Sequence, residues 1–324
     1  MKAIRYEKYG SAEVVLLVDS ARPEPKDDQV LIRIVESILT PSDIASRKGE
    51  PALIRLFSGL TRPKAIPGSD LAGVVAAAGS KVTRFEVGDR IFGAASPATG
   101  THAEYICLPD SAVLAPLPDS IPFASSAGFC DAAMTALTFL RDIAHLESGQ
   151  HLLINGASGA IGTFAIQLAK HFGAHVTAVC STPNIDLVRS LGADEVIDYT
   201  QVDFTSRRNS YDVIFDAVGK SSFSLSKLTL KPEGIYLSTV PSTVLLIQTL
   251  RSRFSSGRRA VFSATGLMQT QEKLNYLLEL LTAGKLKSVV DRHYSLSEMK
   301  EAHHYVESER KRGNLIIDVQ PEAA

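Results

Sequence analysis

The residues best suited to chemistry lie between positions 152 and 162, where an apolar run meets three glycines. The strand-like run at 152–154 leads into Gly156, Gly159 and Gly162, and a second apolar stretch follows. This order predicts a strand, a phosphate-binding turn and a helix. Gly159 would let the backbone approach a pyrophosphate, and Gly162 would let the helix pack closely on its strand. The chemistry indicated is therefore binding of a dinucleotide.

The glycine pattern departs from the usual fingerprint at one position. Dinucleotide-binding turns carry G-x-G-x-x-G, and the first of these glycines falls at Ala157 in this chain. Any glycine-bearing turn between a strand and a helix gives a similar pattern, so the turn alone leaves a purely structural role open. The expected cofactor contacts in this turn are Ala157, Ser158, Gly159, Ala160, Ile161 and Gly162.

The end of the next predicted strand bears on which nicotinamide cofactor is bound. NAD-selective sites place Asp or Glu about 20 residues beyond the glycines, where the carboxylate binds the ribose hydroxyls. Here Cys180 is followed by Ser181, Thr182 and Pro183. No carboxylate in this run would repel a 2′-phosphate, and the hydroxyls of Ser181 and Thr182 are potential donors to it. The sequence therefore favours NADPH, with NADH as the alternative.

Length and composition limit the kind of protein this is. A chain of 324 residues, 45% of them hydrophobic, is long enough for two domains with buried cores. Its net charge of −1 provides no broad field for nucleic acid or an anionic membrane. Three cysteines without C-x-x-C spacing argue against a disulfide framework. We expect a cytoplasmic protein without a leader or a membrane span, because the longest apolar stretch, near 244–250, is far below about 20 residues.

The elements that must position the glycine turn fall into two parts. Short β-rich runs between prolines and glycines predict an irregular β domain over 1–115. From 151 onward, strands alternate with helices, which predicts a doubly wound parallel sheet. The predicted strands are 14–18, 29–36, 73–78, 90–92, 103–108, 151–155, 175–180, 196–197, 213–217, 234–240, 259–264, 288–290 and 314–319. The predicted helices are 125–144, 183–191, 223–230, 270–284 and 297–307.

Four motifs together resemble the medium-chain dehydrogenase/reductase superfamily over essentially the whole chain. They are Ile66-Pro67-Gly68-Ser69-Asp70-Leu71-Ala72-Gly73, Phe85-Glu86-Val87-Gly88-Asp89-Arg90-Ile91-Phe92, the turn at 155–162, and Leu191-Gly192-Ala193-Asp194-Glu195-Val196-Ile197-Asp198-Tyr199. The chain looks most like the zinc-free, quinone oxidoreductase-like members. The resemblance implies an α/β fold with two domains. One is an irregular β, chaperonin-10-like catalytic domain at 1–117 and 266–324, and the other is a Rossmann domain at 118–265.

The resemblance also bears on whether a metal is bound. Zinc-dependent alcohol dehydrogenases of the superfamily hold the metal with a cysteine, a histidine and a third ligand, and the positions that match them here are Thr40, Ser69 and Asp131. A single carboxylate cannot supply the three protein ligands that a catalytic zinc normally needs. The neighbouring His303 and His304 lack a third convergent ligand, so surface or packing roles are expected for them. We therefore predict that the protein binds no zinc.

Without zinc, reduction is the favoured direction of the chemistry. Hydride delivery to a quinone or an α,β-unsaturated carbonyl needs only modest hydrogen bonding at the acceptor oxygen. By resemblance, Ser42 stands at the position of a proton-relay hydroxyl, and Thr40 can donate to a substrate oxygen. Asp131 can orient either hydroxyl or a water. A merely structural role is the alternative for each of the three.

The resemblance assigns further contacts to the cofactor. Thr135 is expected near the nicotinamide ribose or carboxamide, Tyr199 near the 2′-phosphate, and Asn314 approaches from the C-terminal segment. The ends of the later strands are expected to line the cofactor with Ala217, Val218, Gly219, Ser238, Thr239 and Val240. Core packing is the alternative for the apolar members.

The leading prediction is an NADPH-dependent, zinc-independent oxidoreductase that transfers a hydride to a quinone or an α,β-unsaturated carbonyl. One alternative is an alcohol or aldehyde dehydrogenase-type enzyme. Another is a nucleotide-binding regulatory or interaction protein that has kept the fold. The expected partners are a small-molecule carbonyl or quinone substrate and a second copy in a homodimer, whose shared sheet the strand at 259–264 would extend.

Overall fold

Two compact units make up the computed structural model of this chain. It describes residues 1–50, 52, 55–63, 66–95, 100–240, 242–252, 257–263 and 269–322. Unit 1 comprises Met1–Asp131, Thr270–Leu278 and Ser288–Ala324, and unit 2 comprises Ala132–Gln269 and Glu279–Lys287. The domain boundaries expected from the sequence stay predictions.

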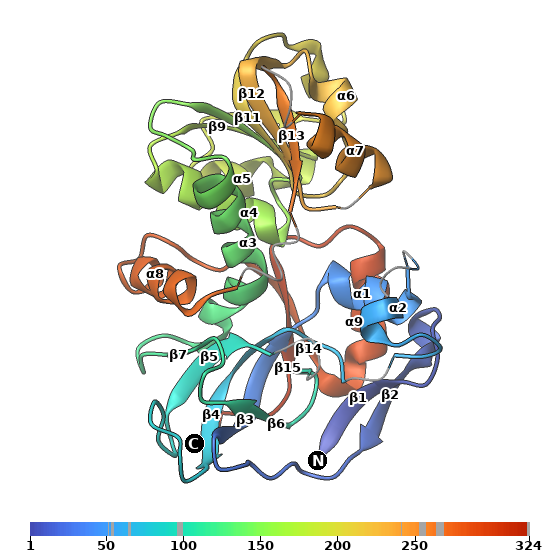
Figure 1. Cartoon of the computed structure of the whole chain (residues 1–324), viewed down its shortest axis with the longest axis vertical. Helices are drawn as coiled ribbons and strands as arrows, with labels where there is room; N and C mark the ends of the chain where they lie inside the picture. Colours follow the sequence, from blue (N-terminus) through green and yellow to red (C-terminus); the bar gives the residue numbers. More distant parts are fainter. Residues whose placement is uncertain are drawn as a thin grey trace. The chain divides into compact units, whose positions relative to one another are not determined.

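Unit 2 contains a six-stranded parallel sheet in the order β10-β9-β8-β11-β12-β13. Figure 1 labels four of these strands, β9, β11, β12 and β13. The strands are β8 (His151–Asn155), β9 (His175–Cys180), β10 (Glu195–Asp198), β11 (Tyr211–Asp216), β12 (Leu230–Ser238) and β13 (Arg259–Phe262). The chain adds β9 and β10 on one side of β8 and then β11, β12 and β13 on the other. This is the Rossmann strand order, and it confirms the predicted doubly wound sheet.

The central strands of this sheet are apolar without alternation. Leu152, Leu153 and Ile154 of β8 are wholly buried, and so are Ile214 and Phe215 of β11. Helices contact the strands, and parallel strands that are covered on both faces can be apolar throughout. The helices of unit 2 are α3 (Met134–Leu137), α4 (Ala160–His171), α5 (Ile185–Ser190), α6 (Phe223–Ser226) and α7 (Thr243–Ser252).

Unit 1 is built on a seven-stranded sheet in the order β14-β15-β3-β4-β5-β7, with β6 paired to β3. Its strands are β3 (Gln29–Ile38), β4 (Asp70–Ala78), β5 (Arg90–Ala94), β6 (Tyr105–Pro109), β7 (Leu114–Pro116), β14 (Val290–Ser295) and β15 (Asn314–Asp318), and β1 (Lys2–Tyr6) and β2 (Val15–Asp19) form a separate hairpin. Ile32, Val75 and Ile91 lie in its core. This mixed, irregular β unit agrees with the predicted fold class.

The helices of unit 1 begin with α1 (Pro41–Lys48), which the sequence analysis did not predict. Thr40 caps it in a capping box with Asp43, Pro41 opens its first turn, and Gly49 closes it at a φ of 66° in the left-handed region. The other helices are α2 (Arg55–Ser58), α9 (Met299–Glu307) and α8 (Gln271–Thr282), within which the chain passes from one unit to the other. Helix α9 packs against α1 and the β1–β2 hairpin (Figure 1).

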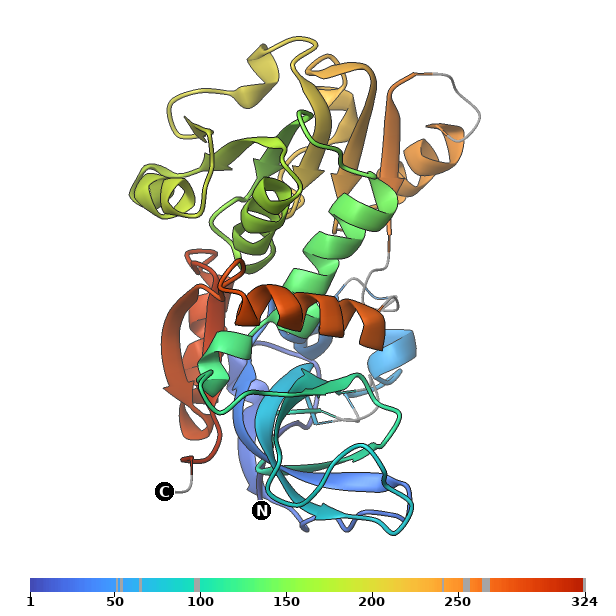
Figure 2. The same cartoon turned by 90° about the vertical axis from the view of Figure 1, so that its left-hand side faces the viewer.

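The segment Phe123–Ile143 is mostly helical (Figure 2), but it is interrupted at Ala127, whose ψ is 131°, and at Gly128, whose φ is 76°. A 3₁₀ turn at Phe123–Ser126 and π-helical turns at Phe129–Ala133 and Thr138–Ile143 flank α3. Its 21 residues are long and apolar enough to cross a membrane by length and composition, but 83% of its apolar window is buried inside the protein. A buried core helix passes the same test, so this is weak support for a membrane span. The prediction that the longest apolar stretch lies near 244–250 is therefore wrong.

Most other predicted elements match the structure to within a few residues, and the misses have physical reasons. The strand expected at 288–290 is wrong, because β14 begins only at Val290 and its mostly polar sequence lies half-exposed at the sheet edge. The helix expected at 223–230 ends at Ser226, because β12 begins at Leu230. The predicted strand at 259–264 ends at Phe262, and Ala264 lies outside the described residues.

Candidate functional site

The switch point of the unit 2 sheet lies between β8 and β11, which are paired side by side. In open α/β sheets, ligands bind beyond the carboxyl ends of the strands at such a point. The turn after β8 contains Gly156 and Gly159, and Ala217 opens the loop after β11. The backbone N–H of Ala217 donates to the Asn155 carbonyl oxygen at 3.1 Å, which ties the two loops together.

The glycine turn is shaped as a phosphate cradle requires. Gly156 has a φ of 79°, in the left-handed region that favours glycine. A Cβ atom on Gly162 would stand 2.3 Å from the Gly156 carbonyl oxygen, so only glycine lets α4 pack this close. A Cβ atom on Gly159 would meet only that same oxygen, at 3.4 Å, so open space lies above the N-terminus of α4. These residues fit a dinucleotide pyrophosphate.

Asp216 orders the loop after β11, a role that the sequence analysis missed. Its Oδ1 accepts from the Asn155 side-chain amide at 3.0 Å and from Gly219 N–H at 2.9 Å. Its Oδ2 accepts from Ser221 N–H at 2.9 Å and from the Tyr236 hydroxyl at 2.8 Å. The carboxylate is wholly buried, and five donors, with Val218 N–H included, satisfy it. A buried acid at the end of an apolar strand was the available signal.

The predicted contacts from the later strands meet one another at this edge of the sheet. A Cβ atom on Gly156 would lie 2.4 Å from a Val218 methyl carbon, and one on Gly219 would lie 2.6 Å from Val240 Cβ. The Thr239 hydroxyl donates to the Ala217 carbonyl oxygen at 3.2 Å. Val218 and Val240 remain 40% and 44% exposed, so they are not core residues. Ser238, in contrast, is buried and accepts from Val240 N–H.

The adenosine side of the turn differs from its prediction in one respect. The sequence offers no carboxylate directly after β9, but the neighbouring strand β10 ends in Asp198, which pairs in register with Cys180. The Thr182 hydroxyl donates to Asp198 Oδ2 at 2.5 Å. The expectation that no carboxylate would oppose a 2′-phosphate considered only the run after β9, and the structure adds Asp198 from the next strand. Tyr199 follows it, 60% exposed, and Ser181 accepts from the Asn184 amide.

In unit 1, the hydroxyl of Thr40 is engaged by the capping box of α1. It donates to Asp43 Oδ2 at 2.8 Å, and the Thr40 backbone N–H donates to the same oxygen at 2.9 Å. Asp43 Oδ1 accepts from Gly68 N–H at 3.1 Å, which links α1 to the segment before β4. Ser42 lies exposed in the first turn of α1. Its hydroxyl is therefore accessible where that of Thr40 is committed.

Asp131 lies beside a second acid, Asp70. The backbone N–H groups of Asp131 and Cys130 both donate to Asp70 Oδ2 at 3.1 Å. Burial and then the Asp43 charge raise the pKa of Asp131 to about 6, against the opposing charge of Lys311. Burial followed by the Asp131 charge raises the pKa of Asp70 well above its usual value. Asp43 thus accepts a hydrogen bond from Thr40 and also raises the pKa of Asp131.

Lys311 and Asn314 complete this part of unit 1. Burial lowers the pKa of Lys311 to about 8 against the opposing charge of Asp131, and its ammonium donates to the Gly313 carbonyl oxygen at 2.7 Å. Sequence reasoning missed this lysine, because it lies in a short polar segment without a motif. Asn314 is buried, and its amide donates to the Ser288 hydroxyl at 3.0 Å. In unit 2, Thr135 is buried on α3.

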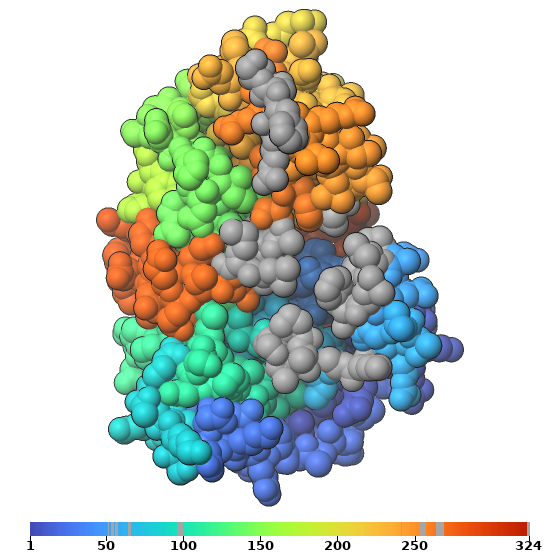
Figure 3. All heavy atoms as spheres, in the orientation of Figure 1, coloured from blue at the N-terminus to red at the C-terminus, as the bar shows by residue number. Residues whose placement is uncertain are grey.

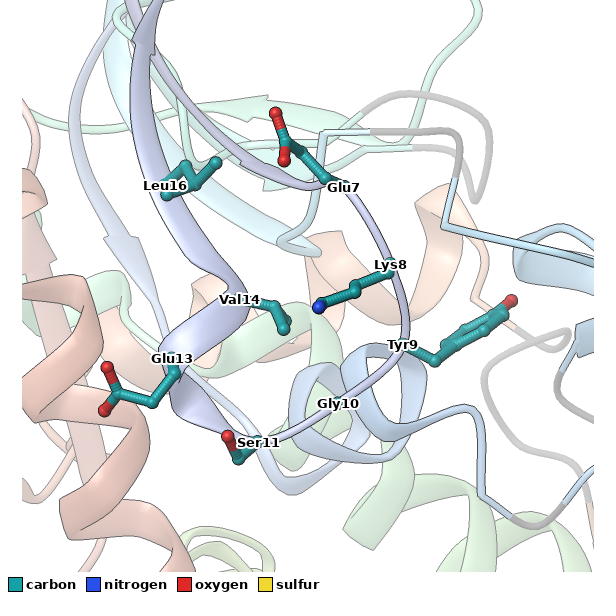
Figure 4. A pocket seen from close by; sticks show the side chains of 8 residues that line it. All are labelled: Glu7, Lys8, Tyr9, Gly10, Ser11, Glu13, Val14 and Leu16. Atoms are coloured by element: carbon teal, nitrogen blue, oxygen red, sulfur yellow. The ribbon is translucent and has the colours of Figure 1, made fainter.

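A hollow of about 340 Å³ lies within the loop between β1 and β2 (Figure 4). Lys8 points into it, whereas Tyr9 points away, toward Ser58, whose hydroxyl lies 2.8 Å from its own. Val14 and Leu16 supply apolar lining. None of the predicted site residues line this hollow, so we do not assign the site to it.

Comparison with known proteins places this arrangement in a family. The family model described as alcohol dehydrogenase GroES-like domain matches residues 26–119, and the one described as zinc-binding dehydrogenase matches 191–317. The chain is 32% identical to a chloroplastic quinone-oxidoreductase homolog of Spinacia oleracea, over 98% of each chain. It belongs to the medium-chain dehydrogenase/reductase superfamily, in its quinone oxidoreductase-like branch.

Two further comparisons support membership of the superfamily. The chain is 33% identical to the chloroplastic NADPH-dependent alkenal/one oxidoreductase of Arabidopsis thaliana, over 98% of this chain and 79% of that protein. A solved structure, the quinone oxidoreductase from Coxiella burnetii, is 30% identical and covers 99% of each chain with a TM-score of 0.88. The likeness to the medium-chain dehydrogenase/reductase fold therefore extends over nearly the full length.

The name of one family model raises the question of zinc. The residues at the three ligand positions of zinc-dependent medium-chain dehydrogenases are Thr40, Ser69 and Asp131, and the Thr40 hydroxyl already donates to Asp43. Among the described residues, no group of three or more His, Cys, Asp or Glu could hold a metal ion. His303 is buried, with its Nε2 3.1 Å from the Tyr6 hydroxyl, and exposed His304 faces Glu13. This donor set does not fit a catalytic zinc.

Proposed function

We propose that this protein is an NADPH-dependent, zinc-independent oxidoreductase that transfers a hydride to a quinone or an α,β-unsaturated carbonyl. The proposal rests on one observation above all: a glycine cradle at the switch point of a Rossmann sheet, in a chain similar over its full length to a quinone-oxidoreductase homolog. NADPH is the favoured cofactor because one relative is named as NADPH-dependent and because hydroxyl groups follow β9.

Within unit 2, we assign the cofactor to the carboxyl edge of the sheet. The turn after β8 would hold the pyrophosphate on backbone N–H groups at the start of α4. The loops after β11 and β12 would line the dinucleotide, and Thr135 would contact the nicotinamide side. The proposed contacts in unit 2 are Thr135, Ala157, Ser158, Gly159, Ala160, Ile161, Gly162, Ser181, Thr182, Tyr199, Ala217, Val218, Gly219, Ser238, Thr239 and Val240, and unit 1 adds Asn314.

The bound nicotinamide supplies the hydride, so the protein has to orient the acceptor and supply a proton. We propose that exposed Ser42 donates a hydrogen bond toward the acceptor oxygen, since its hydroxyl is not held by the capping box. Thr40 can contribute its donor only by leaving Asp43. Asp131, ionised above a pKa of about 6, would orient a water or a hydroxyl for the proton transfer.

The test is a screen of quinones, enals, enones and simple ketones, monitored by NADPH absorbance. Turnover of quinones or enones is expected in the presence of EDTA. The Ser42→Ala variant should lower kcat. Thr40→Ser keeps the hydroxyl and should have the kcat of the wild type, whereas Thr40→Val lacks the hydroxyl and should have a lower kcat. Oxidation of an alcohol with NADP⁺ would instead favour the dehydrogenase alternative. Tight NADPH binding without turnover of any carbonyl would favour a regulatory role.

We further propose a homodimer that forms through unit 2. On α7, Val244, Ile247 and Leu250 recur every three residues and are 58%, 51% and 59% exposed. Such an apolar stripe is typical of an interaction surface, and α7 lies at the surface in the view of Figure 3. It packs beside β13, the last strand of the sheet in the described part of the chain. Light scattering should give twice the mass of one chain, and Ile247→Glu should lower it.

The cellular location also remains part of the proposal. Cys107, Cys130 and Cys180 form no disulfide with one another, which is consistent with a reducing compartment such as the cytoplasm. Two of the relatives named above are chloroplastic, so a plastid is the competing location. No nucleic-acid or membrane partner is proposed, because a net charge of −1 does not attract a nucleic acid or an anionic membrane over the protein as a whole. Fractionation of cells expressing the tagged full chain would decide between the compartments.

A further inference from the structure

Asp198 stands at the end of β10, beside the residues that would receive the adenosine ribose. Its partner in register on β9 is Cys180, directly before Ser181 and Thr182. Its Oδ1 accepts from the backbone N–H and the hydroxyl of Thr200, at 2.9 and 2.7 Å. Its Oδ2 accepts from the Thr182 hydroxyl at 2.5 Å. The carboxylate is therefore held in one orientation, with an oxygen on the very hydroxyl proposed to bind a 2′-phosphate.

The hydrogen-bond donors hold the pKa of Asp198 below its usual value, so the group is ionised at neutral pH. No Lys, Arg or His pairs with it among the described residues. A cation on α5, Arg189, acts on the same strand end. The Cys180 thiol is affected by both charges, because Asp198 adds to the rise that burial causes in its pKa and Arg189 opposes that rise. A carboxylate and a guanidinium thus flank the same strand end.

We propose that Asp198 is a specificity-determining residue that limits the preference for NADPH over NADH. It occupies, from the neighbouring strand, the place of the ribose-binding acid that the end of β9 lacks. In NADH, the ribose 2′-hydroxyl can donate to this carboxylate, as ribose hydroxyls do to acids in NAD-selective sites. The inference rests on the proposed cofactor site.

Two physical effects of Asp198 oppose a 2′-phosphate. First, the single proton of the Thr182 hydroxyl is donated to Asp198 and is not available to the phosphate at the same time. Second, a phosphate monoester carries about −1.5 to −2 charges at pH 7. Across roughly 6 to 8 Å of water, its repulsion by one carboxylate weakens binding about four- to tenfold. Arg189 offsets part of this repulsion, so NADPH still binds.

The experiment compares the wild type with Asp198→Asn by titration calorimetry with NADPH and with NADH. Asparagine keeps the shape and an acceptor for Thr200, but it removes the charge and frees Thr182. The matched control is Asp203→Asn, because Asp203 also accepts from the N–H and the hydroxyl of the threonine two residues further on. Thr205 N–H donates to its Oδ1 at 2.8 Å and the Thr205 hydroxyl to its Oδ2 at 2.7 Å, and Asp203 makes no hydrogen bond to Thr182 among the described residues. The control removes one negative charge five residues away.

The expected result is a rise of about four- to tenfold in the ratio of NADPH affinity to NADH affinity in Asp198→Asn, with no change in Asp203→Asn. The same rise should be seen for 2′,5′-ADP relative to 5′-AMP, two probes that lack the nicotinamide. It should shrink in high salt, which screens exposed charges. An equal ratio in wild type and Asp198→Asn overturns the inference and leaves the cofactor site intact. Failure of the wild type to bind either dinucleotide overturns the proposed function itself.

Discussion

Arg47 of α1 donates from Nη2 to Oε1 of Glu307 on α9 at 2.5 Å, with the whole arginine side chain buried. Its Nε and Nη1 have no hydrogen-bond partner among the described residues. Glu307 is also 2.7 Å from the Lys48 ammonium. The pair ties α9 to the helix that carries Thr40 and Ser42, so it supports the proposed catalytic end of unit 1.

Arg47 has Glu307 as its ion-pair partner, whereas Glu307 also pairs with Lys48. Removing one partner should therefore lower the free energy of unfolding by a different amount from removing the other. Glu307→Gln leaves the buried guanidinium without its counter-charge and should lower the free energy of unfolding by about 2 kcal/mol. Arg47→Met removes both the charge and the unpartnered donors, while Glu307 keeps Lys48, so it should cost less than about 1 kcal/mol. Urea unfolding measures both. An Arg47→Met protein less stable than Glu307→Gln would contradict this account.

A pH profile tests the coupling between Asp43 and Asp131. If ionised Asp131 orients the proton donor, kcat/KM should rise as pH increases through about 6, the pKa of this carboxyl. Since the Asp43 charge raises that pKa, Asp43→Asn should move the rise to lower pH, while the asparagine oxygen keeps an acceptor for the cap of α1. Asp131→Asn should abolish the rise. A profile that is unchanged in all three proteins would remove Asp131 from the mechanism.

The two glycines of the cofactor turn should respond differently to alanine. Gly162→Ala forces a methyl group to within 2.3 Å of the Gly156 carbonyl oxygen, so it should lower the free energy of unfolding by about 1–3 kcal/mol. In Gly159→Ala the added methyl group lies 3.4 Å from the Gly156 carbonyl oxygen, an ordinary van der Waals contact, so this variant should fold normally. Its methyl group would stand where the pyrophosphate approaches, so NADPH binding should weaken roughly tenfold, a cost of about 1.4 kcal/mol. Thermal unfolding and calorimetry separate the two effects.

Glu36 on β3 makes stability fall as pH rises. Burial, followed by the Asp318 charge, raises its pKa from 4.5 to about 7. Because the folded state binds this proton more tightly than the unfolded state, the contribution is complete below about pH 4.5 and is lost as pH rises through 7. Glu36→Gln should therefore match the wild type at pH 4 and exceed it by about 1 kcal/mol at pH 8, after allowance for partial exposure. Denaturant midpoints at both pH values provide the check.

Metal removal should leave the protein active. The donor set at Thr40, Ser69 and Asp131 does not fit zinc, so dialysis against EDTA is expected to leave both turnover and the melting temperature unchanged. A structural or catalytic zinc centre holds one ion per site, so elemental analysis of a protein without such a centre should find fewer than roughly one zinc per ten chains. One tightly held zinc per chain would falsify this expectation.

Local sequence was sufficient for the parts of the fold that depend on neighbouring residues. The strand, turn and helix at 152–171 follow from an apolar run and from three glycines whose spacing is typical of a tight turn between a strand and a helix. The same holds for the motifs that indicated the superfamily and its doubly wound sheet. Helix α1 was missed because most of its residues are polar, and because its start depends on a hydrogen bond between Thr40 and Asp43 rather than on an apolar repeat.

The tertiary structure alone decided which charges meet. Asp198 reaches Thr182 because β10 pairs with β9 in register, although 16 residues separate them in sequence. Lys311 affects Asp131 from a segment 180 positions away, and Glu307 reaches Arg47 across 260. Hydrogen bonds and charge pairs depend on distance in space, and no local pattern reports them. The sequence by itself therefore determined the family and the glycine turn that we propose as the cofactor site, whereas folding determined which charges act on Asp131 and Asp198.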